Sequence, residues 1–347
     1  MLAAVYHGID DLRLEERDVP PIGEEEALLR VRAASICATD LRILGAGHFK
    51  IPEGTTRVLG HEFAGEVAAV GARVIGLAVG MRIALAPNIG CGVCEQCIQG
   101  RNHLCPNYEA FGITLDGAFA EYMRVPAAAI RQGNIVEIPE DLPFDQAALN
   151  EPLSCCYNGF LACRVQLGDI VLIVGAGPIG LMHLLLARSG GASQVIVSEV
   201  DAERGAQARE FGADIVVNPA EEDLFARLNK ETRGHRADVV IVAAPVHQAQ
   251  EQALELAAVQ GRINYFGGLP KGKETIAFNS NRVHYRQLVV TGTTGSSIHQ
   301  YRQTMSLLAS RRIDSGRFIS TRYQLHDIHA AFRHARSRQA LKIVVEV

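Results

Sequence analysis

A run of apolar residues leading into a glycine-rich turn constrains this chain more than any other feature. The strand-like run Val171–Val174 is followed directly by Gly175-Ala-Gly-Pro-Ile-Gly180. In such a turn the first glycine permits a sharp bend, the second lets a ligand approach the backbone, and the third lets the next helix pack closely on the strand. The sequence therefore predicts a strand, a tight turn and a buried helix through Arg188, whose N-terminus offers free N–H groups.

Strand-like and helix-like segments alternate after this turn. The apolar runs lie at residues 194–198, 239–243 and 262–266, and the helical patterns lie at residues 203–211 and 248–258. Such alternation is typical of a parallel sheet with helices on both faces. We therefore predict an α/β fold with a doubly wound Rossmann domain over residues 151–294.

The rest of the chain has a different pattern. Short β-like runs at Ala27–Ala33, Gly65–Val70 and Arg82–Ala86 are bounded by turn residues, which predicts an irregular, mostly β domain over residues 1–150. Residues 295–347 contain a helical pattern and end in an apolar, strand-like run, and we expect them to return to the first domain. A length of 347 residues suits two domains.

Composition and charge point away from nucleic acid and membrane. The chain has 34 Lys and Arg against 38 Asp and Glu, so its net charge of −4 favours no polyanion. Basic residues near the C-terminus are spaced as the solvated face of a helix: Arg333, His334, Arg336 and Arg338. The N-terminus lacks the pattern of a secretory leader, and glycines with Pro178 interrupt the uncharged stretch Ile170–Ala187, which disfavours a membrane span. We therefore expect a cytoplasmic protein.

An acidic residue follows the second strand of the predicted Rossmann domain. Glu199 lies 24 positions after Gly175, close to the offset of about 20 at which a carboxylate binds the ribose hydroxyls of a dinucleotide. The same carboxylate repels the 2′-phosphate of NADP, so the pattern favours NAD. Arg204 lies five residues further on and could approach the adenosine end, which weakens the preference for NAD over NADP.

Four of the eight cysteines lie close together as Cys91-x₂-Cys94-x₂-Cys97-x₇-Cys105. Four thiolates satisfy tetrahedral zinc completely and leave no open position, so the spacing predicts a structural zinc site. An iron–sulfur cluster is the alternative for four thiolates. Zinc is favoured because a hydride-transfer site needs no electron relay.

A second candidate constellation is dispersed along the chain. Cys37, the pair His61-Glu62, and Glu151 are metal-ligating residue types. Individually they also fit a small buried thiol, a turn histidine and carboxylates at helix N-termini. Their spacing in the sequence does not by itself show that they form one metal site.

The motifs together resemble the zinc-dependent medium-chain dehydrogenase/reductase family, specifically its sorbitol (L-iditol) and threonine dehydrogenase branch. The similarity extends over nearly the whole chain. It rests on Cys37-Ala-Thr-Asp40, Gly60-His-Glu-Phe-Ala-Gly-Glu66, the four-cysteine segment, Gly117-Ala-Phe-Ala-Glu-Tyr122, Glu151-Pro-Leu-Ser154 and Gly175-Ala-Gly-Pro-Ile-Gly180. The resemblance implies a GroES-like catalytic domain with a zinc lobe at about residues 88–108, a Rossmann NAD-binding domain, and two zinc ions per chain.

The resemblance also assigns site residues. It implies that Cys37, His61 and Glu62 bind a catalytic zinc, with Glu151 as a mobile carboxylate that is either a fourth ligand or a partner of zinc-bound water. Thr39 resembles the hydroxyl that passes the alcohol proton towards the cofactor ribose, and Asp40 is a natural acceptor for the ligand histidine. The cofactor contacts that the resemblance implies are Gly175, Gly177, Pro178, Ile179, Gly180, Glu199, Arg204, Phe266, Gly267, Gly268 and Thr293.

The reaction implied by the resemblance is reversible oxidation of a secondary alcohol of a polyol or sugar alcohol by NAD, in a homodimer or homotetramer. Alternatives are an L-threonine 3-dehydrogenase, a cyclic-polyol or sugar-acid dehydrogenase, and a non-catalytic NAD sensor on the same fold.

Two features of the sequence differ from what is typical of the family. Arg42 stands where many relatives have a histidine that releases the proton, leaving water, Glu151 or His48 for that step. The stretch Val290–Ser296 lacks the arginine and aromatic residues with which animal sorbitol dehydrogenases hold a polyol.

Overall fold

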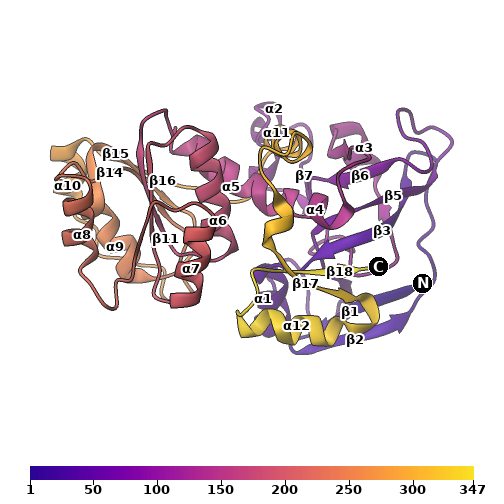
Figure 1. Cartoon of the computed structure of the whole chain (residues 1–347). Coiled ribbons are helices and arrows are strands. Elements are labelled where there is room, and N and C mark those ends of the chain that lie inside the picture. The colour runs from indigo at the N-terminus through magenta and orange to yellow at the C-terminus, as the bar shows by residue number, and fades with distance from the viewer. The chain divides into compact units, whose positions relative to one another are not determined.

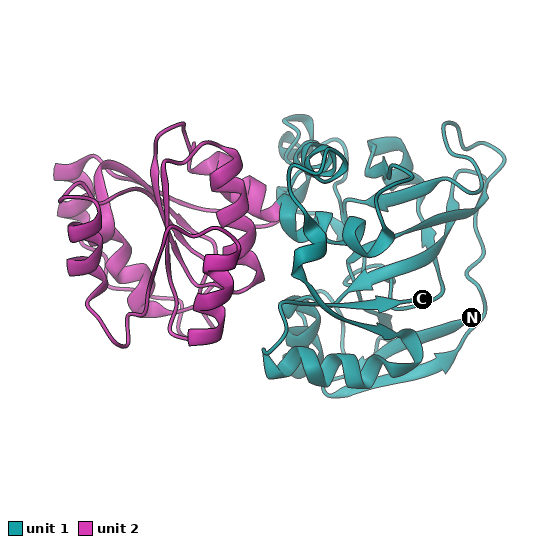
Figure 2. Cartoon of the chain, viewed as in Figure 1, with its two compact units in different colours: residues 1–154, 296–347 teal, residues 155–295 magenta.

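The computed structural model describes all residues, 1–347, and the chain divides into two compact units (Figures 1 and 2). Unit 1 contains residues 1–154 and 296–347, and unit 2 contains residues 155–295. The first boundary lies after Ser154 rather than after residue 150. The start of helix α5 (Asn150–Ala162) belongs to unit 1, where Asn150 donates a hydrogen bond to the Tyr301 carbonyl and the Ser154 hydroxyl lies 2.7 Å from that of Ser296.

Unit 1 is dominated by short strands. They are β1 (Leu2–Gly8), β2 (Asp11–Glu16), β3 (Ala27–Ser35), β4 (Arg57–Val58), β5 (Glu62–Val70), β6 (Arg82–Leu85), β7 (Asn88–Ile89), β8 (Glu109–Ala110), β9 (Tyr122–Val125), β10 (Ile135–Glu137), β17 (Ile319–Gln324) and β18 (Lys342–Glu346). The largest sheet has the order β10-β6-β5-β3-β18-β17, with β9 also paired to β3. Two smaller sheets have the orders β2-β1-β4 and β7-β8.

The C-terminal segment completes the sheet of unit 1. Strand β18 pairs antiparallel with β3 and parallel with β17, so residues from both ends of the chain share one core. Alternate side chains of β3, among them Leu29 and Val31, are fully buried, as expected for a strand that contacts the core. The helices of unit 1 are α1 (Ala38–Ala46), α2 (Glu95–Ile98), α3 (Ala127–Gln132), α4 (Phe144–Ala148), α11 (Ile298–Ala309) and α12 (Ile328–Ser337), with short 3₁₀ turns at Asn102–Leu104, Ser315–Phe318 and Leu325–Asp327.

Unit 2 is a six-stranded parallel sheet with the order β13-β12-β11-β14-β15-β16. Its strands are β11 (Ile170–Val174), β12 (Gln194–Ser198), β13 (Ile215–Val217), β14 (Ala237–Val242), β15 (Ala257–Tyr265) and β16 (Val289–Gly292). Its helices, besides α5, are α6 (Pro178–Ser189), α7 (Ala202–Glu210), α8 (Leu224–Glu231), α9 (His247–Leu256) and α10 (Ser280–Arg286). Numbered in order of sequence, the strands are arranged 3-2-1-4-5-6: β12 and β13 extend the sheet on one side of β11, and β14, β15 and β16 extend it on the other. This is the doubly wound order in which a dinucleotide binds at the switch point.

The predicted elements of unit 2 are confirmed, with one large difference in bounds. Strand β15 begins at Ala257, whereas the sequence predicted a helix to residue 258 and a strand only from residue 262. Ala257 and Ala258 are buried, and Gln260 within the strand has a left-handed backbone conformation, with a φ of 60°. Small apolar residues suit either helix or strand, so their pattern did not locate this boundary.

The structure also places the basic residues near the C-terminus and the uncharged stretch of residues 170–187. Helix α12 carries three of the basic C-terminal residues, and Arg338 directly follows its end. Arg333, Arg336 and Arg338 are exposed as predicted, whereas His334 is half-buried, with Nδ1 3.2 Å from the Tyr323 hydroxyl. The apolar stretch 170–187 forms β11, the glycine turn and α6. Among the helices of the chain, none combines the length and the apolar character that crossing a bilayer requires.

Candidate functional site

The pairing of β3 with β5 brings the dispersed candidate ligands of unit 1 together. Ser35, near the end of β3, is opposite Glu62 at the start of β5. Cys37 follows two residues later as the residue that precedes helix α1, and His61 directly precedes Glu62. As a result the ligand atoms of Cys37, His61 and Glu62 all lie within 4.8 Å of one another.

A buried carboxylate orients this group. Asp40 is completely buried in the first turn of α1. Its Oδ2 accepts a hydrogen bond from the Cys37 amide at 2.9 Å, and its Oδ1 accepts one from the Gly60 amide at 3.3 Å. The same Oδ1 lies 3.3 Å from Nδ1 of His61. Asp40 therefore faces Nδ1 of the ring, the arrangement in which a carboxylate orients a metal-binding histidine and leaves Nε2 for the metal.

The electrostatics of the cluster favour a cation. Burial disfavours a charged His61, but the negative charges of Asp40 and Cys37 outweigh burial and raise the pKa of His61 well above its usual range. In addition, Oε1 of Glu62 is buried without a hydrogen-bond partner. An unpaired buried carboxylate oxygen is costly unless it binds a cation or a proton donor. A thiolate, an imidazole and this oxygen fit zinc and leave a position for a substrate oxygen.

A lysine that sequence reasoning missed lies beside the cluster. Lys342, in β18, is only 5% exposed, and its Nζ lies 2.5 Å from Oε2 of Glu62. Burial disfavours its ammonium, but the negative charges of Glu62, Cys37 and Glu151 together outweigh burial and raise the pKa of Lys342. The signal in the sequence is one lysine within the apolar run Leu341–Val347, because a charged residue in a buried strand requires a partner.

The structure does not group Glu151 with the other three candidate ligands. Glu151 is 7% exposed in the first turn of α5, and it lies outside the cluster of ligand atoms formed by Cys37, His61 and Glu62. Its negative charge nevertheless acts on Lys342. A role for Glu151 as a direct ligand therefore stays a prediction.

Two positively charged side chains, Arg42 and Lys50, lie close enough to His48 for their charges to act on its ring. Arg42 donates a hydrogen bond to Oγ1 of Thr39 at 3.4 Å. His48 is half-buried and stacks on Phe49; burial first, and then the charges of Arg42 and Lys50, lower its pKa. Lys50 lies over the ring of Tyr108 at 3.3 Å.

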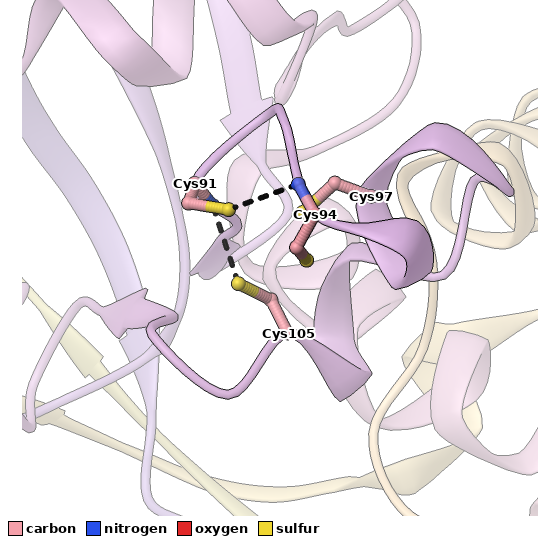
Figure 3. A group of neighbouring side chains, drawn as sticks. All are labelled: Cys91, Cys94, Cys97 and Cys105. Atoms are coloured by element: carbon pink, nitrogen blue, oxygen red, sulfur yellow. Dashed lines mark hydrogen bonds between the residues drawn. The ribbon is translucent and has the colours of Figure 1, made fainter.

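The four cysteine side chains of the lobe, residues 91–105 of unit 1, lie next to one another (Figure 3). The sulfur atoms of Cys91, Cys94, Cys97 and Cys105 lie within 4.8 Å of one another, and none of the eight cysteines forms a disulfide. The Cys91 amide donates to the Cys105 sulfur at 3.3 Å, and the Cys94 amide donates to the Cys91 sulfur at 3.4 Å. Amides directed at sulfur are the surroundings of thiolates that bind metal.

The surroundings of these thiols support a cation in the lobe. Backbone amides lower the pKa of Cys91 to about 6. Burial, together with the neighbouring Cys94 and Cys105, raises the pKa of Cys97 to about 12. Four adjacent thiols cannot all ionise without a compensating positive charge, so both shifts fit a Cys₄ metal site. The lobe leaves no space at Gly90, where a Cβ would lie 2.5 Å from the sulfur of Cys97.

The glycine turn of unit 2 has the geometry expected of a pyrophosphate site. Gly175 has a φ of 104°, which other residues rarely adopt. A Cβ on Gly177 would meet nothing within 4 Å, so a ligand can approach the backbone there. A Cβ on Gly180 would lie 1.8 Å from the Gly175 carbonyl, so only glycine allows α6 to approach β11. Pro178 occupies the first turn of α6, and Ile179 follows it.

The acidic residue predicted to bind ribose lies against this turn. Oε2 of Glu199 accepts a hydrogen bond from the Ala176 amide at 2.7 Å, and its Oε1 accepts one from the Asp201 amide at 3.0 Å. Both contacts hold the carboxylate beside the glycine turn. Arg204 lies in the first turn of α7, where its amide donates to Asp201.

The remaining predicted cofactor contacts follow the ends of β15 and β16. Phe266, Gly267 and Gly268 come directly after β15, and Thr293 comes directly after β16, where its hydroxyl donates to Asn264. The glycine turn and Glu199 likewise follow β11 and β12. Because the sheet is parallel, all of them lie at its carboxyl edge, where ligands bind in open α/β sheets.

Sequence reasoning also missed His183 in α6. The ring packs edge-on against Phe266 with centroids 4.8 Å apart. It is completely buried, and neither ring nitrogen has a hydrogen-bond partner. Burial lowers the pKa of His183 to about 3, so the ring is neutral near physiological pH.

Unit 2 has a parallel sheet of the dinucleotide-binding type, and unit 1 is mostly β with two groups of metal-binding side chains. This combination is typical of zinc-dependent dehydrogenases. Comparison with protein families agrees. Residues 23–140 match the alcohol dehydrogenase GroES-like domain, and residues 178–310 match the zinc-binding dehydrogenase domain. The chain belongs to the zinc-dependent medium-chain dehydrogenase/reductase family and is an NAD-dependent alcohol dehydrogenase.

Known proteins are similar over nearly the full length. L-Threonine 3-dehydrogenase of Pyrococcus horikoshii is 38% identical over 338 residues, which cover 95% of this chain and 94% of that protein. Sorbitol dehydrogenase of Bacillus subtilis is 31% identical over 349 residues, covering 99% and 97%. A solved structure from Sinorhizobium meliloti, described as a zinc-binding dehydrogenase bound to NADP, superposes with a TM-score of 0.92 at 33% identity and covers 100% of this chain and 99% of that one.

Proposed function

We propose that this enzyme oxidises a secondary alcohol with NAD at a zinc ion bound by Cys37, His61 and Glu62. The observation that carries the proposal is the convergence of these three ligand atoms within 4.8 Å, with Oε1 of Glu62 buried and unpartnered among them. Asp40 holds the backbone of Cys37 and faces the ring of His61. The lobe cysteines Cys91, Cys94, Cys97 and Cys105 are proposed to bind a second, structural zinc.

Zinc supplies Lewis acidity that lowers the pKa of a bound alcohol. The chain supplies the route for the proton, and Thr39 is the proposed first acceptor. Because Arg42 donates to Oγ1 of Thr39, the hydrogen of that hydroxyl is free to point to another acceptor. Arg42 cannot itself accept a proton. His48, whose pKa is lowered first by burial and then by Arg42 and Lys50, is neutral near pH 7 and is the candidate base in its place, with Glu151 as the alternative.

The proposed preference for NAD rests on Glu199. Its carboxylate is held against the glycine turn by the Ala176 amide, where it can accept hydrogen bonds from ribose hydroxyls and repel a 2′-phosphate. The structural relative from Sinorhizobium meliloti was solved with NADP, so related proteins differ in this choice. Arg204 is the residue of this chain that could favour NADP.

We predict that Glu199→Ala raises the KM for NAD and relaxes the rejection of NADP. Hydrogen bonds to a charged group are worth about 1.5–3 kcal/mol, which corresponds to roughly 10- to 100-fold in KM. Steady-state kinetics with both cofactors measure the effect. Glu203→Ala, an exposed change in the first turn of α7, is the control and should leave both KM values unchanged. An unaltered ratio of NAD to NADP efficiency in the Glu199 variant would contradict the assignment.

For the substrate we propose first a polyol or sugar alcohol of the sorbitol or L-iditol type. Sorbitol dehydrogenase of Bacillus subtilis is among the full-length relatives. The stretch Val290–Ser296 is small and rich in hydroxyl groups, so it does not itself select among alcohol substrates.

A second candidate is oxidation of L-threonine, and a specific observation favours it. Arg42 and Lys50 lie close enough to His48 for both charges to act on its ring, and neither forms an ion pair with a carboxylate of this chain. An unneutralised cation beside Thr39, here Arg42, would suit the carboxylate of an amino acid. L-Threonine 3-dehydrogenase of Pyrococcus horikoshii is also more similar to this chain than the sorbitol dehydrogenase.

A substrate panel distinguishes these proposals. Sorbitol, L-iditol, cyclic polyols, sugar acids and L-threonine are supplied separately with NAD, and NADH formation is followed by absorbance. Turnover of neutral polyols supports the first candidate, and turnover of L-threonine alone supports the second. Arg42→Gln should raise the KM for L-threonine and leave the KM for a neutral polyol unchanged. Absence of turnover with every secondary alcohol, in protein shown to contain two zinc ions, would count against the proposed reaction.

We further infer a cytoplasmic homodimer or homotetramer joined through the free edge of the unit 2 sheet. Strand β16 ends this sheet, and Val289 is 50% exposed on it. We predict that Val289→Glu lowers the molar mass measured by light scattering, because it places a charge in an apolar interface. The control is Leu167→Glu, which is 89% exposed elsewhere on unit 2. A single protomer mass for the unaltered protein would contradict the inference.

A further inference from the structure

Lys342 contacts the candidate catalytic site from the side of the protein core. Strand β18 brings it next to β3, and its Nζ donates to the Ile36 carbonyl at 3.0 Å. The same Nζ donates to Oε2 of Glu62 at 2.5 Å. Ile36 immediately precedes Cys37, so one ammonium group contacts the backbone beside one candidate ligand and the side chain of another.

The two oxygens of Glu62 therefore have different surroundings. Oε2 is bound by Lys342, whereas Oε1 is buried with no hydrogen-bond partner. Glu62 itself is completely buried, so water does not compensate Oε1. The ion pair leaves one oxygen, and only one, available to the group formed with Cys37 and His61.

We propose that Lys342 is a positioning residue that makes Glu62 a one-oxygen metal ligand and limits the negative charge that the metal receives. This inference rests on the proposed metal site at Cys37, His61 and Glu62. A thiolate and a carboxylate neutralise a divalent cation, and a third negative charge, Glu151, lies close enough to act on Lys342. The lysine opposes these charges, so the bound cation stays a stronger electrophile.

Removing the ammonium group of Lys342 should raise the affinity for zinc and lower kcat. In Lys342→Met the carboxylate of Glu62 becomes more basic and free to offer both oxygens, so zinc binds more tightly. The same change donates more negative charge to the cation and weakens its effect on a bound alcohol, so kcat falls. Simple damage to the fold would instead weaken zinc binding and lower kcat together.

The experiment measures zinc affinity by competition with a chromophoric chelator, using the full-length protein. We expect Lys342→Met to increase affinity at one site by about 10-fold or more and to lower kcat by roughly 10- to 100-fold, the range seen when groups behind metal ligands are changed. The Cys₄ lobe is an internal reference because Lys342 does not contact it. Replacing zinc by cobalt adds a visible spectrum that reports a change in carboxylate coordination at the one-thiolate site.

Two further variants separate the charge of Lys342 from its packing. Lys342→Arg keeps the charge and donors and should retain zinc affinity within a few-fold of the unaltered protein. Glu62→Gln should weaken zinc binding, and adding Lys342→Met to Glu62→Gln should then have little further effect. Such coupling in a double-mutant cycle is expected of groups that act through each other. The double variant also carries no buried unpaired charge at this position, which keeps the test available if Lys342→Met alone fails to fold.

The outcomes distinguish this inference from the proposed function. Weaker zinc binding in Lys342→Met, an unchanged affinity, or additive effects with Glu62→Gln would each overturn the positioning role while leaving the reaction intact. Unaltered protein that binds zinc only at the lobe would instead overturn the proposed metal site, and the inference about Lys342 with it.

Discussion

Replacement of His61 by alanine, or of Cys37 by serine, is expected to abolish turnover while NADH binding persists. Each change removes one of three ligand atoms that the β3–β5 pairing brings within 4.8 Å. A serine hydroxyl at position 37 is a poor substitute for a thiolate, and alanine at position 61 supplies no ligand atom. Unit 2, which carries the predicted NADH contacts, is untouched by either change.

The size of the effect follows from what a Lewis acid contributes. Stabilising the developing alkoxide is worth several kcal/mol, so kcat/KM should fall by about a thousandfold or more. Zinc content, measured by atomic emission, should drop from two ions per chain to one. NADH binding, followed by its fluorescence, should change little.

The matched control for His61 is His299→Ala, because His299 is exposed on α11 in the same unit. It should retain both zinc ions and full activity. Near-normal turnover of the His61 or Cys37 variant would refute the metal assignment. Loss of NADH binding together with turnover would show that the change had damaged the fold.

Those parts of the fold and the site that depend on one short segment of the chain could be predicted from the sequence. The glycine turn predicted β11 and α6, and the carboxylate after β12 identified Glu199, because each signal lies within one short segment. The spacing of Cys91 to Cys105 predicted a metal-binding lobe for the same reason.

The parts that depend on strand pairing could not be predicted from spacing. Ser35 and Glu62 become neighbours only through the register of β3 and β5, so Cys37 and His61 were connected by resemblance to a family. Glu151 was predicted with them, but its side chain lies outside their cluster. Lys342 reaches Glu62 across 280 residues of sequence, and no local pattern identifies such a partner.

His183 illustrates a second limit. A single histidine within an apolar helix has no periodic signature, and its meaning depends on what surrounds it. Here neither ring nitrogen has a hydrogen-bond partner, and the ring packs edge-on against Phe266. The consequence appears in stability rather than in the site.

We predict that His183→Leu makes the protein markedly more resistant to acid. Burial lowers the pKa of His183 to about 3 in the folded protein, whereas an unfolded chain has an ordinary histidine pKa of about 6.5. Between these values the unfolded state binds a proton that the folded state does not. The free energy of unfolding therefore decreases as the pH falls from about 7 towards 3, by a total on the order of 4–5 kcal/mol, and this loss is absent without the histidine.

The measurement is urea unfolding of both proteins at pH 7 and pH 5. Over this interval the linkage predicts that the unaltered protein loses about 2 kcal/mol more than His183→Leu. Acid release of metal affects both proteins equally and cancels in the difference. His284→Leu, an exposed histidine on α10 of the same unit, should not reproduce the effect. Equal losses in the unaltered protein and in His183→Leu would mean that the folded protein binds a proton at His183 by pH 5, because the predicted difference requires a ring that stays neutral there.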